Sequence, residues 1–193
     1  MGTVLIVAPH PDDEVLGAGG FLRKSHDKGD KAVVLTVSGH LPPLYSRHVY
    51  ETTVAEARKA HSILGVYESI YLEIPATQVA DTPVHELNGK IRAVVERHQP
   101  DIVLCPYPDR HIDHRAVFDS VLVATRPIGY GRCIKLIAAY ETLSETHWNA
   151  PHIEPNFTPN WIVDISDQID AKTEALNCFS SQIAEFPLFP TRS

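Results

Sequence analysis

The sequence predicts an α/β fold with a mostly parallel sheet flanked by helices. Strand-like apolar runs alternate with helix-like segments along the chain, which is typical of βαβ units. The length of 193 residues and the 44% hydrophobic content are sufficient for one substantial core. Repeats, low-complexity tracts and linkers are absent from the sequence. We therefore expect residues 1–193 to form a single domain, a Rossmann-like three-layer sandwich.

Short apolar runs, many rich in β-branched residues, predict six strands at about 3–9, 32–38, 69–73, 101–105, 134–140 and 161–165. The segments between and after them predict five helices at about 13–28, 50–64, 84–98, 114–125 and 168–182. The first strand is the clearest, because Val4–Ala8 is an unbroken apolar run of the kind found in buried parallel strands. The first helix opens with Asp12–Glu14, and acidic residues are favoured in a first turn.

An imidazole and three carboxylates stand where the first strand ends. The carboxyl ends of strands are where open α/β sheets bind ligands. His10 and Asp13 can converge on one cation, while Asp12 points elsewhere and accepts a proton. The alternative is that Asp12 caps the helix and that Asp13 and Glu14 complement its dipole.

A second polar segment, Cys105–Arg115, directly follows the strand-like run Ile102–Leu104. Two strands that end in His/Asp clusters can place both clusters on one edge of a sheet. His114 can then complete a triad with His10 and Asp13. Three protein ligands and one open position are what a catalytic zinc site requires.

His111 and Asp113 remain outside this triad. His111 is a candidate to face the substrate, and Asp113 can hydrogen-bond an imidazole and thereby fix its tautomer. The alternative for this segment alone is a solvated loop. Both clusters following strand-like runs in one short chain favours the metal site.

These motifs resemble those of the LmbE/PIG-L family of zinc-dependent N-acetylglucosaminyl deacetylases. The resemblance rests on Ala-Pro-His-Pro-Asp-Asp-Glu-x-Leu-Gly-x-Gly-Gly, from Ala8 to Gly20, and on His-x-Asp-His at 111–114. Weaker matches extend over most of the chain, at Glu56–Ala60, Leu64–Gly65, Val163–Ser166, Lys172, Ala175–Leu176 and Ser181–Gln182. The family implies removal of the N-acetyl group from an N-acetylglucosamine-type sugar or glycoconjugate, with release of acetate and a free amine.

The resemblance also assigns roles by position. It makes three residues the zinc ligands: His10, Asp13 and His114. Asp12 becomes the general base, His111 a cationic group that stabilises the oxyanion, and Asp113 the partner that holds His111. Fe²⁺ or Co²⁺ would suit the same ligands.

Substrate contacts are less well defined. Many family members have a sugar-holding arginine where this chain has Thr53, and Arg47 or Arg58 can take its place. Trp148 can stack on a sugar ring or cover the core. The candidates for substrate binding are Arg47, Arg110, His147 and Trp148. Family members usually continue past Pro190–Ser193, so we expect either a naturally short member without the usual C-terminal extension or a truncated one.

Three glycines after the first strand, Gly17, Gly19 and Gly20, do not form a dinucleotide fingerprint, because the strand-to-helix turn holds carboxylates that repel phosphate. We expect them to let the helix pack closely against the sheet. Four histidines outside the two motifs are interpreted as solvated or packed side chains: His26, His61, His85 and His98.

The amino-acid composition argues against some classes of binding partner. A net charge of -7 argues against nucleic acid and anionic membranes. Three scattered cysteines and an amino terminus without a basic leader or a long apolar run predict a cytoplasmic protein. The oligomeric state stays open, a homo-oligomer included.

Two rival functions remain: a metal-dependent phosphoesterase, which commonly holds two metal ions, and a non-catalytic sugar-binding module on the same fold.

Overall fold

The computed structural model describes residues 1–147, 150 and 156–182. Its centre is a sheet of five strands in the order β3-β2-β1-β4-β5, with every pairing parallel. The strands are β1 (Thr3–Ala8), β2 (Lys31–Gly39), β3 (Glu68–Pro75), β4 (Ile102–Pro106) and β5 (Leu136–Tyr140). The predicted parallel α/β sheet is confirmed.

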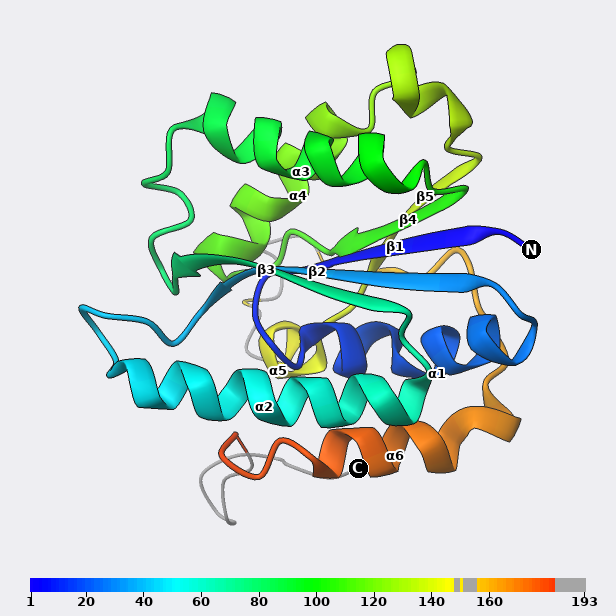
Figure 1. The fold of residues 1–193 in the computed structure, drawn as a ribbon, viewed down its shortest axis with the longest axis horizontal. Coiled ribbons are helices and arrows are strands. Elements are labelled where there is room, and N and C mark those ends of the chain that lie inside the picture. The colour runs from blue at the N-terminus through cyan, green and yellow to red at the C-terminus, as the bar shows by residue number, and fades with distance from the viewer. Residues whose placement is uncertain (148–149, 151–155, 183–193) are drawn as a thin grey trace.

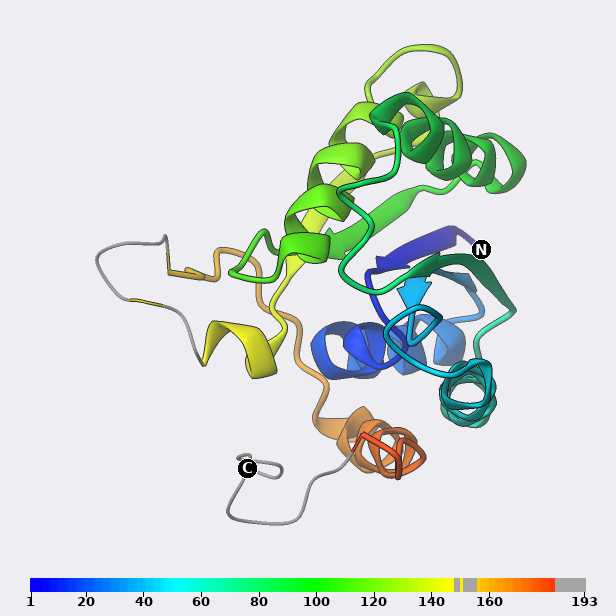
Figure 2. The ribbon, with the colours of Figure 1, turned by 90° about the vertical axis from the view of Figure 1, so that its left-hand side faces the viewer.

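Helices cover both faces of this sheet (Figure 1). The helices are α1 (Asp13–Asp27), α2 (Arg47–Leu64), α3 (Val84–His98), α4 (Ile112–Ala124), α5 (Leu143–Thr146) and α6 (Ile169–Asn177), with 3-10 turns η1 (Gly129–Cys133) and η2 (Ser166–Gln168). Figure 2 shows α3 and α4 on one side of the sheet and α1, α2 and α6 on the other. Each face has its own apolar core, so the expected three-layer sandwich is present.

The chain leaves β1 toward β2 on one side and later enters β4 on the other side of β1. This reversal of strand order is the topological switch point, where ligands of open α/β sheets bind. The segment after β1 carries His10, and the segment after β4 carries His111 and His114. The order of the strands therefore brings the two sequence motifs to one edge of the sheet.

The strand expected at 161–165 does not form, and residues 161–165 have no regular secondary structure. Trp161 packs edge-on against Phe21 of α1, with ring centroids 5.6 Å apart, and Ile162 is 83% exposed. Its apolar residues thus lie over a helix and in solvent and not against the sheet. The last predicted helix is also shorter than expected, ending at Asn177.

Two glycines of α1 confirm the close packing. A Cβ atom on Gly17 would lie 2.2 Å from the ring of Tyr140, and one on Gly20 would lie 2.4 Å from Ile165. The partner of Gly17 belongs to β5, as expected, whereas the partner of Gly20 belongs to the irregular segment before α6. Within the described ranges no helix combines the length and hydropathy needed to cross a membrane.

Candidate metal centre

The turn after β1 places its polar side chains differently from a capped helix start. Asp12 precedes α1 with φ 130 and ψ -31, and its side chain makes no capping hydrogen bond. Asp12 therefore occupies the N-cap position of α1, but its side chain does not cap the helix as the alternative required. Asp13 is buried, and its Oδ2 accepts a hydrogen bond from the backbone N–H of His10 at 3.0 Å.

Asp13 lies between two imidazoles that are about a hundred residues apart in the sequence. Its Oδ2 is 3.3 Å from Nδ1 of His10 and 3.3 Å from Nε2 of His114. Ligands of a tetrahedral ion with bonds of about 2.0 to 2.1 Å are separated by about 3.3 to 3.4 Å. Two nitrogens and one carboxylate oxygen are also a donor set that zinc uses in catalytic sites. The residues present therefore fit a zinc ion.

The charges of these groups favour a cation. Burial alone would lower the pKa of His10, but the carboxylates of Asp113 and Asp13 raise it to about 9. Burial would likewise lower the pKa of His114, which Asp13 and Asp109 raise to about 10. Although burial would raise the pKa of Asp13, His114 and His10 hold it well below its usual range. The cluster thus stabilises positive charge between its carboxylates.

Each of the two imidazoles also contacts a second carboxylate. Nε2 of His10 is 2.9 Å from Oδ2 of Asp113, and Nδ1 of His114 is 2.7 Å from Oδ2 of Asp109. Such contacts fix the ring and leave the other nitrogen to bind the metal. Asp113 therefore orients His10, and the expected contact of its carboxylate with His111 is wrong.

The loop after β3 holds the carboxylate of Asp113 in place. The backbone N–H groups of Thr77 and Val79 donate to the two oxygens of Asp113, at 2.7 and 3.3 Å. Thr77 has φ 69, a conformation that is unusual for a β-branched residue. Strained backbone of this kind is concentrated at functional sites.

His111 joins the same cluster. A ring nitrogen of His111 lies within 4.8 Å of ligand atoms of both His10 and His114. Its Nδ1 accepts a hydrogen bond from the backbone N–H of Asp113 at 3.1 Å. Burial, followed by the charges of His10 and His114, lowers the pKa of His111 to about 4. Because Nδ1 accepts this hydrogen bond, the structure favours a neutral ring with its proton on Nε2 over the expected cation.

Asp12 is half-buried, and its carboxyl group is close enough to Asp13, His10 and His114 to be affected by their charges. Burial, and then the charges of Asp13 and Glu14, raise the pKa of Asp12 well above its usual range. A carboxylate with a raised pKa is better matched to accepting a proton near neutral pH. This is the property that a general base requires.

The candidate substrate residues are spread more widely. Arg47 pairs with Glu73 at 3.1 Å and, together with Arg58, lines an open groove of about 440 Å³ beside β3, two strands away from β1. Arg110 is exposed in the loop between Asp109 and His111, and His147 is exposed after α5. Trp148 lies outside the described residues.

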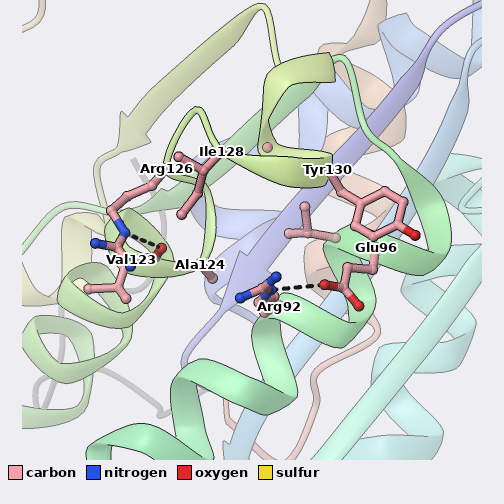
Figure 3. A pocket seen from close by; sticks show the side chains of 9 residues that line it. Arg92, Glu96, Val123, Ala124, Arg126, Ile128 and Tyr130 are labelled. Carbon is pink, nitrogen blue, oxygen red and sulfur yellow. Dashed lines mark hydrogen bonds and ion pairs between the residues drawn. The ribbon is translucent and has the colours of Figure 1, made fainter.

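A second, smaller cavity is lined by residues of the C-terminal halves of α3 and α4 and by η1 (Figure 3). Its volume is about 20 Å³, and it is enclosed by α3, α4 and η1, near the amino ends of the strands. This space holds roughly one water molecule. It is too small for a sugar.

Three contributors to the site carry no recognisable signal in the sequence. Asp109 belongs to the second motif, but only the fold of the loop turns it back toward His114. Thr77 and Val79 act through backbone N–H groups, which any residue has.

Comparisons with known proteins agree with this geometry. Residues 5–125 match the model of the PIG-L family, described as GlcNAc-PI de-N-acetylase. A "Diacetylchitobiose deacetylase" of Thermococcus kodakarensis is 31% identical, over 94% of this chain and 70% of that protein. A "Probable N-acetyl-alpha-D-glucosaminyl L-malate deacetylase 2" of Bacillus anthracis is 28% identical, over 94% of this chain and 81% of that protein.

A solved structure has the same fold. The conserved protein TT1542 from Thermus thermophilus superimposes with a TM-score of 0.75 and 28% identity, over 94% of this chain and 80% of that chain. The family match spans both segments that form the His/Asp cluster. The chain therefore belongs to the PIG-L family of deacetylases.

Proposed function

We propose that this protein is a zinc-dependent deacetylase that removes the N-acetyl group from an N-acetylglucosamine-type sugar or glycoconjugate. One observation carries the proposal: Oδ2 of Asp13 is 3.3 Å from a nitrogen of each of two imidazoles, in a chain of the PIG-L family. The names of the relatives, which specify diacetylchitobiose and an N-acetylglucosaminyl malate, support the substrate class.

His10, Asp13 and His114 would hold the metal. When bound, zinc lowers the pKa of a water molecule at the site and polarises a carbonyl oxygen. Fe²⁺ or Co²⁺ would suit the same donors. Asp109 and Asp113 keep the two imidazoles in orientation from behind.

Asp12 would act as the general base. Its carboxylate accepts a proton from the attacking water and returns a proton to the nitrogen of the leaving amine, so that acetate and a free amine are released. Its half-buried position beside the cluster, and the burial that raises its pKa, support this role.

His111 would stabilise the oxyanion as a neutral donor. Because its Nδ1 accepts the N–H of Asp113, its Nε2 carries the proton. A neutral imidazole can donate a hydrogen bond to a developing oxyanion. One such donor contributes about 3 to 4 kcal/mol in comparable sites.

The proposal extends to the compartment. Cys105, Cys133 and Cys178 are free thiols. Free thiols without disulfides are usual in a reducing compartment, which supports a cytoplasmic location.

An acetate-release screen tests the function. The zinc-loaded protein is incubated with N-acetylglucosamine, diacetylchitobiose and N-acetylglucosaminides that carry charged or apolar aglycones. We expect acetate and a free amine in equal amounts from at least one of them. Absence of release from every N-acetylated sugar, with one metal ion bound per chain, would contradict the proposal.

A further inference from the structure

A chain of polar contacts, with Glu14 and His61 buried, extends from the backbone of the candidate base to β3. The backbone N–H of Asp12 donates to Oε2 of Glu14 at 3.2 Å. Oε1 of Glu14 is 2.9 Å from Nε2 of His61 on α2, and Nδ1 of His61 is 2.7 Å from Oγ of Ser69 on β3. The chain thus links the turn after β1 to two other elements of the fold.

Burial makes this arrangement costly. Glu14 is 0% exposed and His61 is 3% exposed. A buried carboxylate destabilises the fold unless hydrogen bonds satisfy it. Here both oxygens of Glu14 have a partner, one from His61 and the other from Asp12. An apolar pair would fill the same space without this cost, so the polar pair needs an explanation beyond packing.

The backbone of Asp12 offers that explanation. Its φ of 130 lies in a region that residues other than glycine rarely adopt. Such a conformation persists only where the surroundings hold it. The carbonyl oxygen of Asp12 accepts from Val15 and Leu16 in the first turn of α1, at 2.9 Å each. Its N–H, on the other side of the strained φ angle, is held by Glu14.

We propose that Glu14, His61 and Ser69 are positioning residues that hold Asp12 in the strained conformation that aims its carboxylate at the substrate. This inference rests on the proposed role of Asp12 as general base. His61 fixes Glu14, and Ser69 fixes the ring of His61. None of the three contacts the reacting atoms, so they act through the geometry of Asp12 alone.

The test compares three substitutions of histidine. His61→Leu removes both ring nitrogens at similar volume, and His61→Gln keeps a donor that can reach Glu14. His98→Leu is the matched control, because His98 is also largely buried and faces a glutamate, Glu68, at 3.8 Å. His98 lies at the end of α3, remote from the metal cluster.

We expect His61→Leu to lower kcat by about 10- to 100-fold, the loss that a misplaced catalytic group produces. KM should stay within about two-fold, and one metal ion should remain bound. His61→Gln should restore kcat to within a few-fold of wild type, and His98→Leu should leave it unchanged. A merely structural role would lower stability without this division between kcat and KM and without rescue by Gln.

A second readout is independent of activity. Hydrogen exchange of the Asp12 amide, followed by NMR on the zinc-loaded protein, should be at least about 10-fold faster in His61→Leu than in wild type or His98→Leu, since the amide loses a fixed acceptor. If His61→Leu does not fold, Ser69→Ala removes the last link only and should show a smaller change in the same direction.

The outcomes separate the two proposals. A zinc-loaded wild type that releases no acetate refutes the proposed function, while Asp12 exchange still decides the positioning role. If wild type is active, and His61→Leu matches His98→Leu in both kcat and Asp12 exchange, the positioning proposal is overturned. Unchanged Asp12 exchange in Ser69→Ala, where His61→Leu does not fold, overturns it as well.

Discussion

Asp109 provides the sharpest test of how the proposed metal ligand His114 is held. Its Oδ2 is 2.7 Å from Nδ1 of His114, and its Oδ1 accepts the backbone N–H of His111 at 2.8 Å. In Asp109→Asn one of these oxygens becomes an NH₂ group, which cannot accept a hydrogen bond. The variant therefore loses one of the two contacts, together with the negative charge behind His114.

The expected loss follows from comparable sites. Removing a carboxylate that orients a metal-bound imidazole costs about 10- to 100-fold in metal affinity. This factor corresponds to about 1.4 to 2.8 kcal/mol. The assay is competition for Zn²⁺ with a chromophoric chelator at fixed pH. Asp119→Asn, an exposed substitution on α4, is the control for the charge change.

The reasoning would be refuted if Asp109→Asn and Asp119→Asn bound Zn²⁺ within about three-fold of each other. Such a result would mean that His114 keeps its orientation through packing alone.

Three other predictions concern the base, the oxyanion donor and the packing of α1. Asp12→Asn should retain one zinc ion and lose at least about 10²-fold in kcat; near-normal turnover would place the base elsewhere. His111→Ala should keep zinc and lower kcat more than it raises KM, because the oxyanion forms only beyond the ground state; loss of zinc would instead make His111 a ligand. Gly17→Ala should cost about 1 to 3 kcal/mol of stability, since its Cβ would lie 2.2 Å from the ring of Tyr140, whereas Gly89→Ala meets no atom within 4 Å. Equal Tm values for the two glycine variants would contradict the packing argument.

The local sequence pattern predicted those helices and strands whose bounds depend mainly on neighbouring residues. The helix at 84–98 has the predicted bounds, and β1 and β4 begin and end within one residue of theirs. The prediction of a strand at 161–165 was wrong because an apolar run does not specify which element of the fold it packs against. Trp161 covers Phe21 on α1, so the same hydrophobic residues serve a helix and not a sheet.

In the candidate site, too, some contacts were predictable from the sequence and others were not. Two motifs that follow strands were sufficient to predict that His10, Asp13 and His114 meet, because parallel strands end at one edge. The partners behind them depended on loop conformation. Asp113 was expected to hold His111, yet its carboxylate reaches His10, and only its backbone N–H meets His111.

Contacts between buried side chains that are far apart in the chain could not be predicted from the sequence. His61 stands 47 residues from Glu14, and nothing in its neighbourhood on α2 distinguishes it from a packed histidine. The contact depends on how α1 and α2 lie against the same face of the sheet. Backbone strain at Asp12 and Thr77 also has no signature in residue type, since neither residue favours a positive φ as glycine does.

Metal titration of acetate release tests the central claim most directly. Metal-free protein is mixed with increasing Zn²⁺, and the initial rate of acetate release from an N-acetylated sugar is measured at each ratio. The site formed by His10, Asp13 and His114 predicts a rate that rises linearly and stops rising at one zinc ion per chain. A rate that does not depend on metal, or one that rises to two ions per chain, would contradict a single-metal deacetylase.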